Sequence, residues 1–280
     1  MPHMLETLRR ALGRVFPGCV TVGQAVAFNM FLAFFPVLLF TLGILSNFDF
    51  FHGGLRELPD RLHSFLPPGS EHVMGDYFAT KELHPWRWIW LGLGGMLFAG
   101  TQVLIGLVQG FRIIEEIEPR LSYTKLQIRA FGLFSLTMIP WLAFVFFTVF
   151  GRPMRNWITS VLGLGFWVRW IVAGIYHGLA LLVALAVLIV IYRLGQPAMI
   201  AIRDVLPGAT VATVLWWIVD IGFGFYVRIV PYGTVYRGLA AAIGLLVWMY
   251  MTAMVLFIGA AYNAVSFEED HGPISYRTLT

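Results

Sequence analysis

Five long runs of this chain contain no Asp, Glu, Lys or Arg, and they limit what it can fold into. The runs are residues 15–48, 88–111, 130–151, 170–192 and 238–267. A helix rises about 1.5 Å per residue, so about 20 apolar residues cross the roughly 30 Å hydrocarbon core of a bilayer. Each run is long enough for one crossing. A sixth stretch, 205–230, has a similar length but carries Asp220.

The composition supports the same conclusion. Apolar residues make up 59% of the chain, charged residues only 12%, and the mean hydropathy is +0.77. A soluble fold of this size could not bury so much apolar surface. We therefore expect an all-α polytopic membrane protein, with one membrane domain over residues 1–280. The predicted spans lie near 22–46, 88–110, 130–151, 171–192, 205–229 and 238–264, with a short helical outer loop at 47–86.

An even number of spans places both ends of the chain on the same side of the membrane. Basic residues near the short loops are more frequent on the side of Arg9, once the long first outer loop is set aside. This bias favours the cytoplasmic side for both ends. Arg9, Arg10 and Arg14 alternate with Leu5 and Leu12, so residues 4–16 are expected to form an amphipathic helix on the membrane surface.

Several classes of function leave no trace in the sequence. The net charge of +4 is small and dispersed, which argues against a nucleic-acid surface. The single cysteine, Cys19, excludes an intramolecular disulfide and is expected to be a small apolar packing residue. The four loop histidines are spaced too widely to favour a metal site; they are His52, His63, His72 and His84. We expect no catalytic, cofactor or metal site, and membrane lipids as partners.

Glycine pairs and acidic clusters complete the pattern. Gly106 with Gly110, and Gly174 with Gly178, form Gly-x-x-x-Gly pairs that predict close approach between helices. The acids at 115–118 and at 268–270 follow helices, and both groups are expected to be solvated.

Asp220 is the candidate functional residue that most needs an explanation. An aspartate at the centre of a membrane helix costs roughly 2.5–3.5 kcal/mol on insertion scales, so it should face the bundle interior or water. Arg228 and Arg237 follow within possible reach. Asp220 is therefore expected either to line an internal polar cavity or to form a structural ion pair with one of these arginines.

Three further polar residues lie within the predicted spans. Gln24 and Asn29 are on the first, and His177 is on the fourth. Together with Asp220, Arg228 and Arg237 they form the candidate polar lining of a pathway. The alternative is ordinary hydrogen bonding between packed helices, which accounts equally well for Gln24 and Asn29 and better for His177.

Several ordered motifs resemble the YihY/BrkB family. They are Pro207–Ala212, Phe223–Tyr226, Val235–Ala240, Leu246–Tyr250 and Gly259–Ala264, with Ala25–Phe28 and Phe35–Leu38 in the first helix and Leu66-Pro67 in the loop. The resemblance implies a six-helix protein of the bacterial inner membrane with both ends cytoplasmic. It also implies a family once labelled ribonuclease BN and often described as transporters or virulence-associated proteins.

This chain departs from the family pattern at three positions, one of which is the absence of the acid often found near Trp217. Ala261 stands where the family usually has an acid, and the acidic Asp220 lies near a position that often holds a base. We expect a transporter or translocator of a lipid-like or small amphipathic molecule. Because no Gly-Lys-Ser/Thr loop is present, it would use an ion gradient or facilitated diffusion. The alternative is a non-transporting scaffold, while a ribonuclease is disfavoured because no metal-holding carboxylate set is visible.

Overall fold

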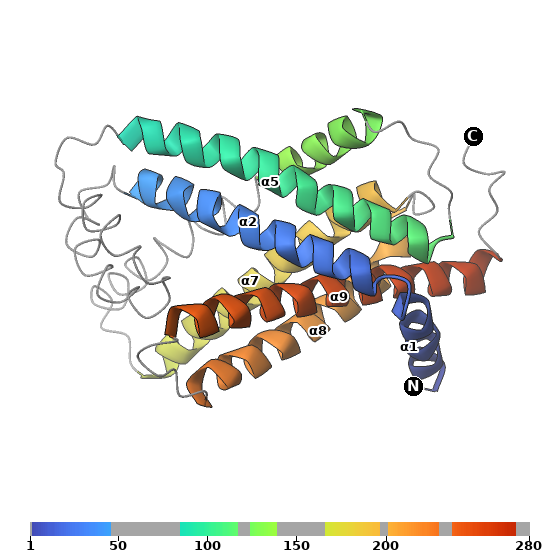
Figure 1. The fold of residues 1–280 in the computed structure, drawn as a ribbon. Helices are drawn as coiled ribbons and strands as arrows, with labels where there is room; N and C mark the ends of the chain where they lie inside the picture. Colours follow the sequence, from blue (N-terminus) through green and yellow to red (C-terminus); the bar gives the residue numbers. More distant parts are fainter. Residues whose placement is uncertain are drawn as a thin grey trace. The chain divides into compact units, whose positions relative to one another are not determined.

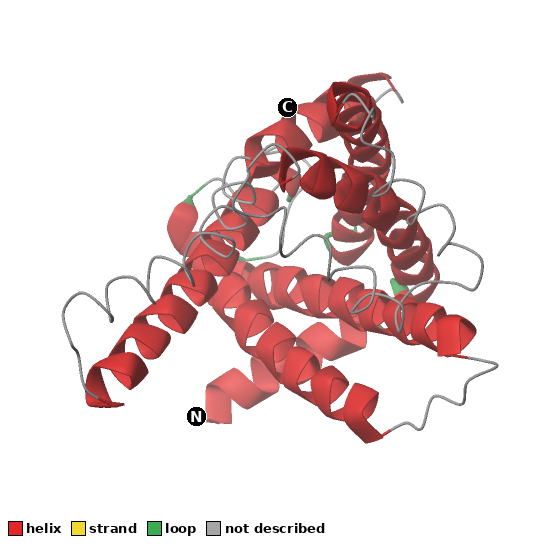
Figure 2. Cartoon of the chain, turned by 90° about the vertical axis from the view of Figure 1, so that its left-hand side faces the viewer, coloured by secondary structure: helices red, strands yellow, loops and turns green. Residues whose placement is uncertain are grey.

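In a computed structural model, every element of the described residues is a helix (Figure 2). The described residues are 2–45, 85–116, 124–138, 166–196, 201–229 and 237–272. The labelled helices are α1 (Pro2–Val15), α2 (Val20–Leu45), α5 (Pro85–Ile114), α7 (Phe166–Gly195), α8 (Ile202–Ile229) and α9 (Arg237–His271) (Figure 1). Residues 124–138 form a further helix. The predicted all-α class is confirmed.

Four of these helices are long and apolar enough to cross a membrane. The qualifying segments are Val20–Thr41, Trp86–Ile114, Ile202–Tyr226 and Ala242–His271, and Leu181–Gly195 is a shorter apolar helix. The predicted span 130–151 is described as helix only up to residue 138, and the predicted loop 47–86 lies almost entirely outside the described residues. The count of six spans therefore stays a prediction.

The observed helices extend beyond the predicted spans. For example, α9 continues from the predicted end at 264 to His271, through Ser266, Glu268 and Asp270. The prediction kept each span within its apolar run. Helical hydrogen bonding continues past the border of that run, because polar side chains at the helix end can be solvated in the headgroup layer.

The chain divides into two compact units. The first unit comprises Met1–Cys19, Val108–Leu215 and Leu256–Thr280, and the second comprises Val20–Leu107 and Trp216–Val255. Helices α5, α8 and α9 each contribute one part to either unit.

In the second unit, α2 and α5 run antiparallel along each other, as Figure 1 shows. Three glycines of α5 and α2 mark this contact. A methyl group at Gly92 would come within 2.6 Å of the Phe40 nitrogen, and one at Gly106 within 2.6 Å of the Val26 side chain. At the other end, Gly43 faces Ile89. The absence of side chains at these positions lets the two backbones approach closely, which confirms the expected role of Gly106.

In the first unit, the closest helix contact joins α8 to α9. A methyl group at Gly208 would overlap the carbonyl oxygen of Gly259, and one at Gly259 would come within 2.7 Å of the Gly208 oxygen. The rings of Phe111 and Tyr192 then pack edge to face at 5.6 Å, and Phe111 packs likewise on Phe257 at 6.1 Å. Such pairs contribute about 0.5–1.5 kcal/mol beyond area burial.

The two predicted glycine pairs have different outcomes. Gly110 packs against the ring of Phe257, so close approach is confirmed there. Gly174 and Gly178 meet no neighbouring atom within 4 Å in the part of α7 that is described. The prediction of a close contact at this second pair is wrong for the described residues, because a glycine spacing fixes a helix face but not a neighbour.

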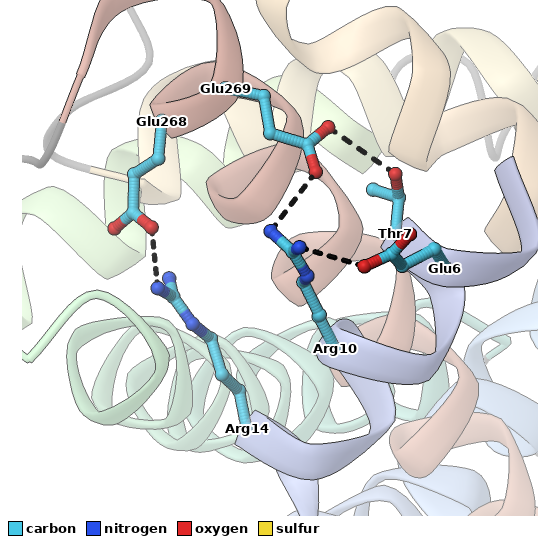
Figure 3. A network of polar contacts seen from close by, with 6 residues as sticks. All are labelled: Glu6, Thr7, Arg10, Arg14, Glu268 and Glu269. Carbon is cyan, nitrogen blue, oxygen red and sulfur yellow. Dashed lines mark hydrogen bonds and ion pairs between the residues drawn. The ribbon is translucent and has the colours of Figure 1, made fainter. Parts of the chain in front are cut away.

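The predicted amphipathic helix near residues 4–16 is confirmed as α1, and its charged side contacts the end of α9 (Figure 3). Arg14 pairs with Glu268 at 2.5 Å, and Arg10 lies 3.5 Å from Glu269. Thr7 donates a hydrogen bond to Glu269 at 3.3 Å. Glu269 is exposed and Glu268 half-buried, so the expected solvation is met in part, while both acids also pair with α1. Exposed pairs are worth about 0.2–1 kcal/mol each, and these are partly shielded.

Cys19 is fully buried in the short turn between α1 and α2. Its thiol points toward the carbonyl oxygen of Gly110 at 3.8 Å, within the first unit. This placement confirms the expected role as a small packing residue. Burial raises the pKa of the Cys19 thiol to about 11, because the thiolate would lose its hydration there.

We predict that Gly208→Ala destabilises the protein by about 1–3 kcal/mol, because the added methyl group meets the fixed backbone of α9. Gly222→Ala, in the same helix, is the matched control, since Gly222 has nothing within 4 Å. Thermal unfolding in detergent should show a lower midpoint for the first variant only. Equal midpoints would show that α8 and α9 do not approach as closely as described.

We predict that the Cys19 thiol resists maleimide at pH 7.5 in the folded protein and reacts after denaturation.

Because burial raises the pKa of Cys19 in the folded protein, the buried thiol contributes its full stability below its ordinary pKa near 8.5. This contribution is lost as the pH rises toward 11. The wild-type midpoint should fall more steeply than that of Cys19→Ala between about pH 9 and pH 11. Parallel curves would contradict the buried placement.

Candidate functional site

A cluster of polar side chains lies in the interior of the first unit. Gln196 donates hydrogen bonds from Nε2 to Glu115 Oε1 at 3.1 Å and to the Ala260 carbonyl at 3.0 Å. Asn263 donates from Nδ2 to Gln196 Oε1 at 3.2 Å and accepts from the Gly208 N–H at 2.7 Å. We call these five residues the buried polar cluster.

The members of the buried polar cluster come from four helix segments, and two of them, Ala260 and Asn263, belong to α9. Glu115 follows α5, Gln196 follows α7, Gly208 is near the start of α8, and Asn263 is near the end of α9. Helix ends leave backbone groups without partners inside the helix, and polar side chains gather where those groups must be satisfied. Here both Nε2 protons of Gln196 are used, so the amide ties α7 to α9 and to the turn after α5.

Glu115 was expected on a solvated face and is instead 5% exposed. It follows the uncharged run by a few residues, so sequence position alone suggested water around it. The missed signal was the presence of Gln196 and Asn263 at the borders of two other apolar runs, since amides there need partners. Sequence analysis did not single out either amide as a site residue.

Arg112 adds a buried cation beside this cluster. It lies in the last turn of α5 and interacts electrostatically with Glu115 and with Arg129. Arg129 donates a hydrogen bond to the carbonyl oxygen of Leu194, in the last turn of α7. Cations near helix C-termini offset the negative end of the helix dipole. We interpret the two arginines as caps on α5 and α7, which compensate the buried Glu115 carboxylate.

A shallow cleft of about 320 Å³ opens between the start of α8 and the end of α9. Its lining consists of Arg203, Asp204, Pro207, Ser266, Phe267, Asp270 and His271. Asp204 accepts the N–H of Ala201 at 3.1 Å, which caps the start of α8, and it pairs with Arg203 at 3.5 Å. Arg203 and Asp204 of this cleft are therefore engaged in local contacts at the start of α8. Among the described residues, no cluster of His, Cys, Asp and Glu is arranged to hold a metal ion.

Asp220 lies in the second unit and is exposed among the described residues, and the expectation that it faces the bundle interior or water stays a prediction. The indole Nε1 of Trp248 donates a hydrogen bond to Asp220 Oδ1 at 3.2 Å. On the same helix Trp217 is 52% exposed and Ile221 is 55% exposed. The carboxylate thus sits beside exposed apolar side chains of the second unit. We call Asp220 and Trp248 the outward carboxylate site.

The other residues of the predicted polar lining do not join Asp220 in the described structure. Gln24 is exposed and Asn29 is half-buried on α2, and within the described residues neither makes a hydrogen bond. The side chains of Arg228, Arg237 and His177 lie outside the described residues. The predicted ion pair of Asp220 with an arginine therefore stays a prediction.

We predict that Asn263→Ala lowers the free energy of unfolding by about 1–3 kcal/mol. It leaves the buried Gly208 N–H and the side-chain oxygen Oε1 of Gln196 without their partner. Thr210→Ala, an exposed position whose hydroxyl bonds only its own helix, should stay within about 0.5 kcal/mol of wild type. Chemical unfolding in detergent would measure both. A small effect at Asn263 would mean that water replaces the amide.

Comparison with known proteins gives one family. The sequence profile of the family described as "Virulence factor BrkB" matches residues 17–276, nearly the whole chain. This match confirms the resemblance inferred from the motifs on α2, α8 and α9. No solved structure matches the chain.

Two relatives illustrate the range of the similarity. A ribonuclease-like protein, YfkH, of Bacillus subtilis is 25% identical over 175 residues, covering 62% of this chain and 64% of the relative. A UPF0761 membrane protein of Xanthomonas axonopodis pv. citri is 22% identical over 241 residues, covering 85% of this chain and 55% of the relative. This chain spans less than two thirds of either relative. Of these two relatives, only the Bacillus protein has a ribonuclease-like name.

Proposed function

The chain belongs to the virulence factor BrkB family of membrane proteins, and on this premise we propose that it translocates a lipid-like or small amphipathic molecule. The proposal includes six spans in the bacterial inner membrane, both chain ends in the cytoplasm, and membrane lipids as partners. The bias of basic residues toward the side of Arg9 supports this orientation. The observation that carries the proposal is the outward carboxylate site.

The depth of Asp220 along α8 makes the carboxylate unusual. Helix α8 has 28 residues, which corresponds to a length of about 42 Å. Asp220 precedes its last residue, Ile229, by nine residues, or about 14 Å. If the helix is centred on a hydrocarbon core of about 30 Å, the carboxylate lies roughly 8 Å below the edge of that core. An aspartate is too short to reach the headgroup layer from there.

The hydrogen bond from Trp248 satisfies only part of this carboxylate. An ionised carboxylate offers about four acceptor sites, and the indole occupies one. In the part of the chain that the structure describes, the second carboxylate oxygen receives no hydrogen bond. A polar group that enters from the bilayer side would lower the cost of keeping the charge in the membrane.

An amphipathic molecule fits this arrangement. Its apolar part can stay among the acyl chains beside Trp217 and Ile221, while an ammonium or hydroxyl headgroup donates to Asp220. Trp248 holds the carboxylate in position and itself packs against Phe223 at 6.1 Å. The site would thus stabilise a headgroup at a depth where bare lipid offers no partner.

We predict that Asp220→Leu lowers the transbilayer flux of amine-headgroup lipid probes at least about tenfold in proteoliposomes. The neutral Asp220→Asn should retain part of the flux of hydroxyl-headgroup probes, since an amide oxygen still accepts a hydrogen bond. Trp248→Phe should have an intermediate effect, because it removes only the positioning bond.

The control is Asp204→Asn, which alters a carboxylate at the start of the same helix and should leave the flux unchanged. Flux of every probe at the wild-type rate in Asp220→Leu would exclude the outward carboxylate site. No flux from wild-type protein for any probe would instead favour the second candidate, a membrane scaffold. That candidate is supported by the dense packing of the buried polar cluster, where Asn263 is fully buried.

A further inference from the structure

Helix α1 presents three distinct faces, each with its own chemistry. Thr7, Ala11 and Val15 lie along one face and are buried against the first unit. Arg10 and Arg14 lie along the second face and pair with Glu269 and Glu268 of α9 (Figure 3).

The third face is apolar and uncovered. It carries Leu5, 63% exposed, Leu12, 37% exposed, and Phe16, 49% exposed. These positions recur at intervals of seven and four residues, so they form one stripe along the helix. We call these three residues the apolar stripe. Arg9 is exposed at its edge.

The chain itself keeps α1 near the membrane. Only Phe16–Cys19 separate α1 from α2, and α2 contains the candidate span Val20–Thr41. Five residue steps from Val15 to Val20 extend at most about 18 Å, so the end of α1 cannot lie farther than that from the start of a span.

The partner acids of α1 lie at the end of α9, beyond the charge-free run 238–267. Helix α9 has 35 residues and a length of about 52 Å, well beyond a core of about 30 Å. Glu268 and Glu269 are in its last turn and a half, so they belong to the aqueous end of α9. The ion pairs therefore hold α1 at the level of the headgroups.

We propose that α1 is a membrane-contact helix whose rotation about its own axis is fixed by α9, so that the apolar stripe enters the boundary between headgroups and acyl chains. The bilayer is the partner that fits, because the stripe adjoins a membrane span and an exposed arginine borders it. Arg9 is placed to contact lipid phosphate, which favours a leaflet that contains anionic phospholipid. This inference does not depend on the transport proposal.

The ion pairs with α9 give the arrangement its specificity. An unrestrained amphipathic helix would turn all its arginines toward lipid phosphate. In α1 two of the three arginines are held by α9, which leaves Arg9 for the phosphates. The buried face of Thr7, Ala11 and Val15 limits the rotation of α1, and the ion pairs restrain its charged side. Without these pairs, α1 would turn Arg10 and Arg14 toward lipid phosphate, and the difference between its stripe and its polar edge would shrink.

The test uses the full chain in nanodiscs of zwitterionic and anionic phospholipids, in a Cys19→Ala background. A fluorescent NBD label is attached at Leu12→Cys or, as a second reporter of the stripe, at Leu5→Cys. The matched control is Gly13→Cys, an exposed position with nothing within 4 Å and a quarter-turn from the stripe. We expect quenching by nitroxide-labelled acyl chains to be at least about twofold stronger at 12 and 5 than at 13. Quenching by aqueous iodide should show the reverse order.

Two outcomes would overturn the proposal. Iodide quenching at 12 and 5 that equals quenching at 13 would place the apolar stripe in water. Protection at 12 and 5 from both iodide and lipid nitroxide would mean that protein, such as a second copy of the chain, covers the stripe.

A second arm tests the role of α9. Glu268→Gln combined with Glu269→Gln should reduce the ratio of lipid-nitroxide quenching at position 12 to that at position 13 to less than about 1.3-fold. The exchange of charges in Arg14→Glu with Glu268→Arg should restore it, because the pair is re-formed with opposite polarity. An undiminished difference in the neutralised variant would show that α9 does not set the rotation of α1.

Discussion

The close contact between the backbones of α8 and α9 is the constraint on which the interior of the first unit depends. Gly208 and Gly259 leave no room for a side chain at this point, so the two helices approach until backbone meets backbone. That distance brings the Gly208 N–H to Asn263, and Asn263 in turn positions Gln196 beside Glu115. A larger residue at either glycine would separate the helices and leave buried amides without partners. The helix packing and the polar hydrogen bonds would therefore be lost together.

The sequence predicts the helices of this protein well, because charge-free runs have only one stable form in lipid. Backbone groups inside a bilayer must be bonded within the segment, so the charge-free runs behind α2, α5, α7 and α9 were expected to be helices. The stretch behind α8 carries Asp220 but is otherwise long and apolar enough for the same argument. The same reasoning could not give their exact ends. The last turns of α9 contain Glu268 and Asp270, which belong to the helix although they do not belong to the apolar run.

The polar contacts were harder to predict than the helices. Glu115, Glu268 and Glu269 all follow apolar runs, and that position is typical of solvated acids. Two are held by α1 and the third by an amide that lies 81 residues away in sequence. Asp220 shows the converse difficulty. Its helix carries apolar residues at 215–219 and 221, which surround the axis, so no periodicity revealed which face the aspartate occupies.

The length of α9 has a practical consequence. Its continuous helix runs past the apolar segment, and ion pairs to α1 restrain its last turns. Small membrane proteins offer few features by which electron-microscopy images can be aligned. A rigid helical fusion that continues from His271 would inherit the direction of α9 and the restraint that α1 supplies. Such a fusion would hold an alignment marker at a fixed angle to the bundle, provided that Arg10 and Arg14 are kept.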